Sequence, residues 1–188
     1  SGISQARRRL GPEPLRLLHD QVVGPIAVRD TQGAWYRRWR LVSLDGSTLD
    51  IADTAENEKA FGRPSASRGT SAYPQLRLVS LVENGTHVLF GTQSGPYHQG
   101  EITLAHRVLP SLRKEMLCLA DRNFFGFDLW KKAHASGAGL LWRVKKNLRL
   151  PCEKRLPDGS YWSTIYRSDR DRRRNVNGIR VRVIEYTL

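Results

Sequence analysis

The sequence contains little cysteine, no long apolar run and few acidic residues. Its two cysteines, Cys118 and Cys152, have no close spacing, so neither a disulfide framework nor a zinc site is expected, and a reducing cytoplasm is the default compartment. No apolar stretch approaches the roughly 20 residues of a membrane span. The N-terminus, which begins with Ser rather than Met, lacks the apolar core of a signal peptide. We therefore expect a piece of a longer chain and no membrane partner.

Basic residues dominate the charge. There are 31 Lys and Arg against 18 Asp and Glu, which gives a net charge of +13. Such an excess favours a polyanionic partner, because each phosphate that a cation neutralises releases condensed counterions. Arg also outnumbers Lys, and its planar guanidinium suits bidentate contact with phosphate. The composition therefore favours nucleic acid as the partner.

Arginines gather at two places that we expect to contact DNA phosphates. The segment 57–75 is rich in Gly, Ser and Pro, so most of it should be a loop, and it carries Arg63 and Arg68. The densest run, RSDRDRRRN, lies near the C-terminus, and its own Asp residues neutralise part of its charge. Its candidate phosphate contacts are Arg167, Arg170, Arg172, Arg173 and Arg174.

The hydrophobic pattern predicts a mixed α/β sheet in which a three-stranded antiparallel meander is followed by βα units. The expected elements are strands at 40–44, 76–84 and 87–94, a helix at 101–115, a strand at 116–121, a helix at 124–137 and a strand at 138–146. Asn84-Gly85 is a hairpin turn signal, Pro110 should end or kink the first helix, and Gly137 should close the second. After Leu148 the alternation of apolar and polar residues predicts an antiparallel β-rich segment.

Two aspartates, Asp45 and Asp121, follow apolar runs that are typical of central strands. In open α/β sheets, functional residues gather at the carboxyl ends of strands. Two carboxylates on neighbouring strands repel each other unless they are protonated or bridged by cations, and Mg²⁺ takes oxygen ligands of this kind. Two metal ions about 3.5–4 Å apart can clamp an in-line phosphoryl displacement. In so basic a chain the pair suggests a nuclease or a strand-transfer enzyme.

Each aspartate also has a plain structural interpretation. Asp45 precedes Gly46, as in a simple turn, and Asp121 is able to cap the helix expected after it. The residues alone leave these alternatives open.

Nucleotide triphosphate binding has no support, because Glu101 and Ile102 stand where the loop GPYHQG would need Lys and Ser or Thr.

Four stretches, taken together, resemble a known family. They occur in the family's order and read LVSLDGSTLDIADTAENEKAFGRP, YPQLRLVSLVENGTHVLF, MLCLADRNFFGFDLWKKAHASGAGLLWRVKKNLRLP and LPDGSYWS. On these motifs the chain is similar to bacterial insertion-sequence DDE transposases of the IS-four type. Asp-Gly-Ser and Ala-Asp-Arg-x-Phe are the signature motifs, and they lie among many matching neighbours.

The resemblance implies an RNase H-like fold with a β-rich insertion at the C-terminal end. It implies that two Asp and one Glu hold two Mg²⁺ or Mn²⁺ ions that cut and rejoin double-stranded DNA, at transposon ends and in target DNA. Asp45 and Asp121 correspond to the two catalytic, metal-binding Asp, and the adjacent Arg122 is a further candidate for DNA contact. A homodimer on DNA and a bacterial, nucleoid-associated location are expected with it.

The expected organisation is a basic lead-in over 1–40, a partial RNase H-like core over 41–147 and a β-rich insertion over 148–188. The family's Glu lies in a Tyr-x2-Arg-x3-Glu-x6-Lys motif, and no tyrosine here has Arg three residues later. Glu185 alternates with its neighbours as an exposed strand residue would. We therefore expect a truncated transposase that is inactive by itself. The alternatives are a non-catalytic DNA-binding remnant and a small nuclease that uses only the two Asp.

Overall fold

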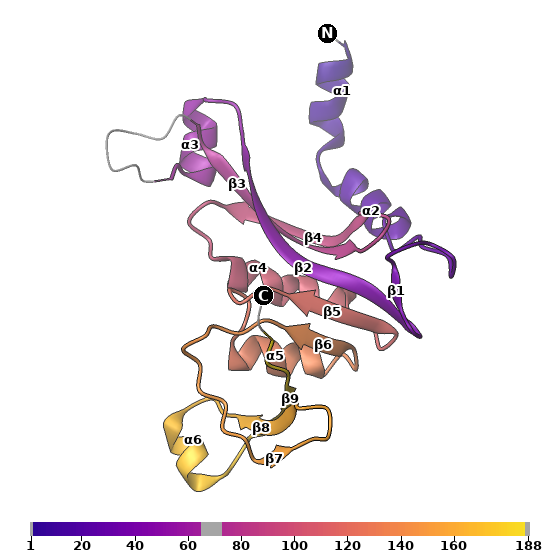
Figure 1. Cartoon of the computed structure of the whole chain (residues 1–188). Helices are drawn as coiled ribbons and strands as arrows, with labels where there is room; N and C mark the ends of the chain where they lie inside the picture. The colour runs from indigo at the N-terminus through magenta and orange to yellow at the C-terminus, as the bar shows by residue number, and fades with distance from the viewer. Residues whose placement is uncertain (1, 65–72, 187–188) are drawn as a thin grey trace.

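The computed structural model describes residues 2–64 and 73–186, and its centre is a mixed six-stranded sheet (Figure 1). The strand order is β4-β3-β2-β5-β6, and β1 pairs with β2 off this path. Strands β2, β3 and β4 form an antiparallel meander, whereas β5 and β6 run parallel to β2. The strands are β1 (Trp35–Tyr36), β2 (Trp39–Asp50), β3 (Gln75–Glu83), β4 (Leu89–Pro96), β5 (Met116–Ala120) and β6 (Gly139–Trp142). The predicted mixed α/β sheet is therefore confirmed.

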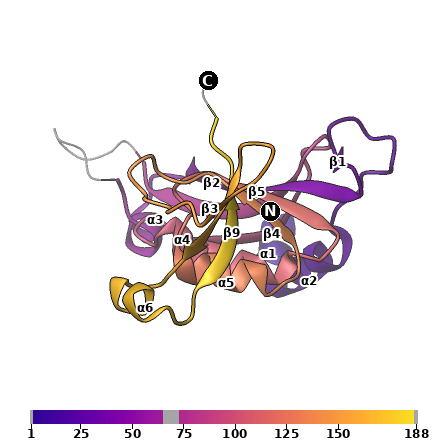
Figure 2. The same cartoon turned by 60° about the horizontal axis from the view of Figure 1, so that its bottom comes forward.

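Helices α4 (Glu101–Val108) and α5 (Phe127–His134) cover one face of this sheet (Figure 2). Alternate residues of the strands point toward these helices, so every second side chain joins the core. The core contains Val42, Leu44, Val79 and Leu81 of the sheet with Leu104, Val108 and Leu129 of the helices. The sheet and these two helices form two layers.

Several local signals act as predicted. The turn at Asn84-Gly85 joins β3 to β4, and Gly85 has a φ of 89°. A Cβ on Gly85 would lie 2.5 Å from the carbonyl oxygen of Gln32, so only glycine fits there. Pro110 ends α4, because the chain continues as a 3₁₀ turn over Leu109–Ser111.

The C-terminal segment forms a second, three-stranded antiparallel sheet. Its strands are β7 (Lys154–Arg155), β8 (Tyr161–Ile165) and β9 (Ile179–Val183), in the order β7-β8-β9. The β-rich character predicted after Leu148 is present, with one difference: the arginine run forms a short helix, α6 (Asp169–Arg174). The Ser168 hydroxyl accepts a hydrogen bond from the Asp171 N–H and so caps that helix.

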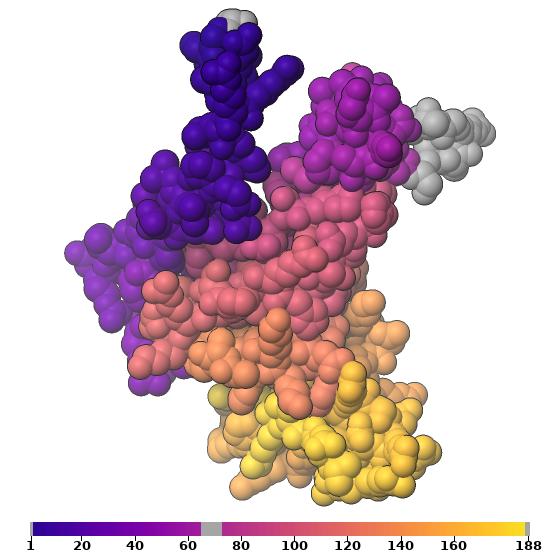
Figure 3. Space-filling model, turned by 180° about the vertical axis from the view of Figure 1, so that it is seen from behind, coloured from indigo at the N-terminus to yellow at the C-terminus, as the bar shows by residue number. Residues whose placement is uncertain are grey.

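Three further helices lie in segments for which no helix was predicted. They are α1 (Gly2–Leu10), α2 (Glu13–Val22) and α3 (Ala55–Phe61). Helix α1 has no buried residue and stands clear of the rest of the molecule (Figure 3). Helix α3 replaces part of the loop expected over 57–75, because the Thr54 hydroxyl caps it by accepting from the Asn57 N–H. Among the described residues, no helix has the length and apolar character that crossing a bilayer requires.

A buried carboxylate, Glu83, joins the N-terminal segment to the sheet. It accepts hydrogen bonds from the N–H groups of Ile26 (3.0 Å) and Ala27 (2.9 Å) and from the Thr86 hydroxyl (2.6 Å). The Arg40 guanidinium pairs with its other oxygen. Glu83 is completely buried, yet each of its oxygens has a donor, which is the condition for keeping a charge inside a protein.

Replacing Glu83 with Gln should lower the free energy of unfolding by about 3 kcal/mol, because Arg40 then lacks its anion in a site shielded from water. Urea unfolding followed by tryptophan fluorescence measures the change. The matched control is Glu56→Gln on the exposed surface of α3, which should change the free energy by less than about 0.5 kcal/mol. Equal effects of the two substitutions would contradict the role given to Glu83.

The same carboxyl group gives the stability a pH dependence. Burial raises the pKa of Glu83, but the hydrogen bonds from Thr86, Ile26, Ala27 and Arg40 outweigh burial and hold the pKa below its ordinary value of 4.5. A group with a lowered folded pKa stabilises the fold above its unfolded pKa, and this contribution is lost as the pH falls through the folded value. Below pH 4.5 the free energy of unfolding should therefore fall more steeply in the wild type than in Glu83→Gln. Superimposable pH profiles would refute the linkage.

Candidate active site

Asp45 and Asp121 come together where the parallel pairing of β2 and β5 ends. Leu44 of β2 is the register partner of Ala120 of β5, and each aspartate is the next residue along its chain. Asp121 directly follows the last residue of β5, as predicted. The shared register therefore makes the two aspartates neighbours across adjacent strands.

The prediction that β2 ends before Asp45 is wrong. The strand runs on to Asp50, because β3 continues to pair with it, from Ser80 opposite Asp45 to Gln75 opposite Asp50. Gly46 starts no turn. A Cβ at Gly46 would lie 3.0 Å from the Glu101 carboxyl carbon, so the glycine leaves room for that side chain. Asp45 lies inside a strand, at the point where one neighbouring strand stops and the other continues.

Asp45 faces away from the helices. Val42 and Leu44 are buried against α4 and α5, and side chains alternate along a strand, so Asp45 points to the opposite face. Cys118 of β5 lies on the helical face, where burial raises the pKa of its thiol to about 12. This thiol stays neutral, so it takes no part in nucleophilic chemistry at physiological pH.

One oxygen of each carboxylate is held by the local backbone. The Gly46 N–H donates to Asp45 Oδ1 and the Asn123 N–H donates to Asp121 Oδ1, each over 2.8 Å. Within residues 2–64 and 73–186, the second oxygen of each accepts no hydrogen bond, and neither carboxylate has an ion-pair partner. Asp121 does not cap α5, whose N-cap is Gly126. Two exposed carboxylates thus occupy adjacent register positions, and no cationic side chain of the described residues pairs with either.

These carboxylates fit a hard divalent cation as two oxygen donors of a larger set. Mg²⁺ is commonly held by one or two carboxylates together with water and substrate phosphates. In the described part of the chain, no group of three His, Cys, Asp or Glu is placed to hold a metal ion. Glu101 lies over Gly46 on the helical face, and Glu185 accepts a hydrogen bond from the Tyr161 hydroxyl over 3.2 Å. Neither completes the pair.

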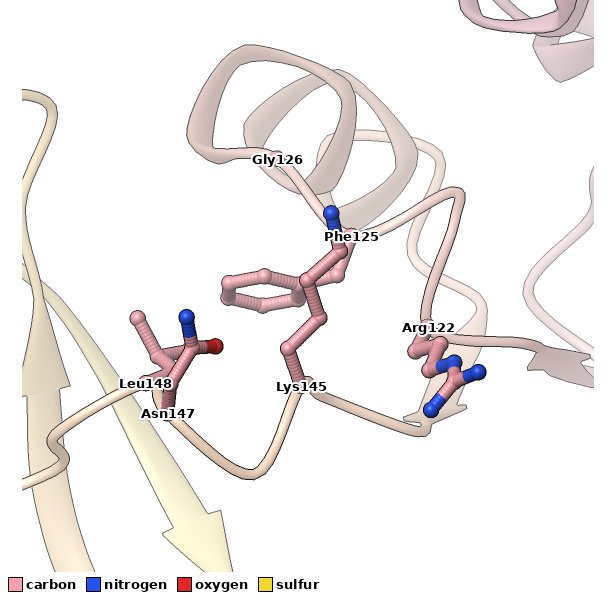
Figure 4. A pocket seen from close by; sticks show the side chains of 6 residues that line it. All are labelled: Arg122, Phe125, Gly126, Lys145, Asn147 and Leu148. Carbon is pink, nitrogen blue, oxygen red and sulfur yellow. The ribbon is translucent and has the colours of Figure 1, made fainter.

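A cleft of about 350 Å³ has in its lining Arg122, the residue after Asp121 (Figure 4). It is lined by Arg122, Phe125, Gly126, Lys145, Asn147 and Leu148. The Arg143 N–H donates to the Ala120 carbonyl over 2.9 Å, so the segment after β6 starts next to the end of β5. The cleft therefore lies between two loops that leave the same edge of the sheet. Sequence reasoning assigned Arg122 to this region and missed the others, although the basic run RVKKNL after β6 was a usable signal.

The predicted DNA-contacting arginines differ in their surroundings. Arg63 pairs with Asp53 and with Glu58 (3.0 Å), Arg167 with Asp128 (3.3 Å), and Arg172 more loosely with Asp169 (3.9 Å). Arg68 lies outside the described residues. Arg170, Arg173 and Arg174 are exposed on α6, which lies at the opposite end of the molecule from α3 (Figure 1). Among the described candidates, Arg122 directly follows Asp121, and Arg167 reaches the first turn of α5 through its ion pair with Asp128.

Comparisons with known proteins agree with the motifs. A family model described as the transposase DDE domain matches residues 38–186. The chain is 31% identical over 144 residues to "Putative transposase InsZ" of Escherichia coli (strain K12), which covers 76% of this chain and 48% of that protein. It is 26% identical over 152 residues to "Transposase InsG for insertion sequence element IS4" of the same strain, covering 77% and 32%. The chain thus spans about half or less of these relatives. No solved structure matches it.

Replacing Asp45 or Asp121 with Asn should leave the fold intact. Asparagine keeps an oxygen that accepts the bond from the Gly46 or Asn123 N–H and removes the repulsion between the carboxylates. We expect a free energy of unfolding within about 0.5 kcal/mol of the wild type, or slightly higher. Urea unfolding of each single variant and of the double variant measures this. A loss above about 1 kcal/mol would mean that the carboxylates serve the fold.

Proposed function

The chain belongs to the transposase DDE domain family, and from this premise we propose that Asp45 and Asp121 are two of the metal-binding carboxylates of a DNA transposase. The proposed activity is cleavage of a phosphodiester at a transposon end, followed by attack of the freed 3′-OH on target DNA. The proposed catalytic fold is RNase H-like, and the strand order β4-β3-β2-β5-β6 supports it.

One observation carries this proposal: two exposed carboxylates are adjacent in register and have no cationic partner in the described residues. Two adjacent like charges repel each other and so destabilise the fold. A role in stability therefore does not explain why both carboxylates are present. Their backbone hydrogen bonds fix the position of one oxygen each and leave the other toward solvent. Such a pair suits a metal ion that arrives together with its substrate.

The proposed cofactor is Mg²⁺ or Mn²⁺, two ions in the complete site. When bound, these ions would supply Lewis-acid stabilisation of the attacking and leaving oxygens. Asp45 and Asp121 would hold them through the oxygens that the backbone leaves free. In the 188 residues no Tyr-x2-Arg-x3-Glu-x6-Lys motif supplies the third carboxylate. We therefore propose that this chain by itself does not cut DNA.

The proposed partner is double-stranded DNA, at transposon ends and in target DNA, with a homodimer assembled on it. The net charge of +13 supports a polyanionic partner. We keep the division into a basic lead-in (1–40), a partial RNase H-like core (41–147) and a β-rich insertion (148–188). The separate sheet β7-β8-β9 supports the last boundary.

A second candidate is a DNA-binding remnant of a transposase without chemistry. The absence of a third acidic ligand near the pair, within the described residues, favours it. The two functions differ in metal binding. A remnant would keep its affinity for DNA, but we would not expect it to bind a divalent cation at Asp45 and Asp121.

Iron-mediated cleavage tests the metal site without requiring activity. Fe²⁺ bound in place of Mg²⁺, with ascorbate and peroxide, should cut the protein backbone near residues 45 and 121, because hydroxyl radicals react close to the metal. Excess Mg²⁺ should suppress these cuts, and Asp45→Asn and Asp121→Asn should abolish them. Mass spectrometry of the fragments locates the cuts.

Asp30→Asn, on the exposed surface, is the matched control and should leave the cuts unchanged. Cuts that persist in both active-site variants would refute the site, and DNA binding without any cuts at these positions would establish the remnant. Plasmid nicking by the wild type in Mn²⁺ should equal that of the double variant. Nicking that either substitution removes would show instead a nuclease that needs only two carboxylates.

A further inference from the structure

We propose that the tip of the β1–β2 hairpin, Arg37 and Arg38, binds backbone phosphates of double-stranded DNA at a distance from the aspartate pair. This inference rests on the proposed function, because duplex DNA is the partner proposed there. It adds a contact at the end of the sheet where β5 begins. The ligand class is the phosphodiester backbone of a duplex, bound without regard to sequence.

The hairpin tip consists of two arginines. Tyr36 and Trp39 are register partners, so Arg37 and Arg38 alone join β1 to β2. Just beyond the hairpin, β2 starts to pair with β5 at Met116, the first residue of that strand. The tip therefore lies at the end of the sheet where β5 begins, whereas the aspartate pair lies where β5 ends (Figure 1).

The backbone at the tip is not the one that an arginine prefers. Arg37 has a φ of 56°, in the left-handed region that a two-residue hairpin loop usually reserves for glycine at its first position. The turn between β3 and β4 follows the common rule, with a φ of 89° at Gly85. A bulky residue in this conformation costs free energy that glycine does not cost. Such strain points to a use of the arginine side chain other than forming the turn.

Both guanidinium groups are available to an anion. Arg37 and Arg38 are exposed, and neither forms an ion pair with a carboxylate in the part of the chain that the structure describes. Arg37 lies over the Tyr36 ring at 5.6 Å, and Arg38 lies over the Trp39 ring at 5.8 Å. Stacking on a ring leaves the guanidinium N–H groups to oxygen atoms. Two adjacent guanidinium groups of this kind suit the phosphates of a DNA backbone, which arginine contacts bidentately.

The strands that carry the tip are held firmly. The Arg40 guanidinium lies over the Trp35 ring at 4.6 Å and pairs with the buried Glu83. The Trp39 ring lies so close to Gly139 of β6 that a Cβ there would come within 2.4 Å of it. Because the support is already ordered, the tip loses less conformational entropy when it binds a ligand.

The distance to the aspartate pair determines the role of this contact. Asp45 follows Arg37 by eight positions on the same hairpin strand. At about 3.3 Å per residue this is at most about 26 Å, or roughly eight base-pair steps of about 3.4 Å. A contact there holds the duplex without touching the reacting phosphodiester, so it acts in binding and not in the chemical step.

Replacing Arg37 with Gly and Arg38 with Ser separates DNA binding from stability, because Gly-Ser is a preferred two-residue hairpin loop. The urea midpoint of unfolding should rise, since the strain at position 37 is relieved. Affinity for a labelled duplex of about 20 base pairs should fall about tenfold near 0.1 M salt. The slope of log affinity against log salt should become less steep by about 1.8, as expected for two lost phosphate contacts. Fluorescence anisotropy in EDTA measures both quantities without any metal.

The matched control is Arg107→Gln with Lys131→Gln, which removes the same charge from exposed positions of α4 and α5. Its salt slope should equal that of the wild type. Wild-type duplex affinity in the Arg37→Gly, Arg38→Ser variant would overturn the proposal. Equal effects of the two double variants would overturn it as well, because they would reflect net charge alone.

These outcomes are separate from those of the proposed function. The Asp45→Asn, Asp121→Asn double variant should keep the dependence of duplex affinity on the hairpin tip. That dependence without iron-mediated cuts at the aspartates would refute only the metal site. Iron-mediated cuts together with wild-type duplex affinity in the Arg37→Gly, Arg38→Ser variant would refute only the hairpin site.

Discussion

The unequal pairing of β2 on its two sides is the constraint on which the site depends. Along its full second half, from Asp45 to Asp50, the strand pairs in the described residues with β3 alone, since β5 leaves it after Leu44. The end of β5 beside the continuing β2 forms a step in the sheet. At this step an interior residue of β2, Asp45, and the residue after β5, Asp121, are both exposed to solvent. Asp45 gains the rigidity of a strand residue, and Asp121 gains the accessibility of a strand end. A site that combines the two is placed more accurately than one made from loops.

The packing on either side of the sheet preserves this step. Glu83 holds the start of β2 through Arg40, and it also fixes the segment at Ile26 and Ala27. On the helical face, the absence of a Gly46 side chain allows Glu101 to lie against the strand just past the step. The strand is therefore fixed before and after Asp45, and the Gly46 N–H holds one oxygen of the carboxylate on this fixed strand.

From the sequence, the elements of the central layer, β2 to β6 with α4 and α5, could be predicted better than their lengths. The turn at Asn84-Gly85 and the end of α4 at Pro110 were predicted correctly, because at each position one residue type determines the backbone conformation. The end of β2 was missed because Asp45-Gly46 has the composition of a turn, and only pairing with the distant β3 overrides it. The placement of Asp45 and Asp121 on neighbouring strands was predictable, because each follows an apolar run that is typical of a central strand.

The cleft was not predictable from the residues alone. Phe125 and Lys145 are 20 positions apart in the sequence, and they meet only because the N–H of Arg143 bonds to the Ala120 carbonyl. Helix α6 was missed for a different reason: its sequence DRDRRR contains no apolar residue that could show a helical period, and the helix depends on its Ser168 cap.

The open face of the sheet determines how much the aspartate pair costs the fold. Leu49, Leu89 and Leu141 lie on this face and are each about half exposed, at 49%, 53% and 52%. Water reaches the same face and screens the repulsion between the two carboxylates, so the fold tolerates them without a cationic side chain paired to either in the described residues. Any element that covered those leucines would exclude this water and strengthen the repulsion.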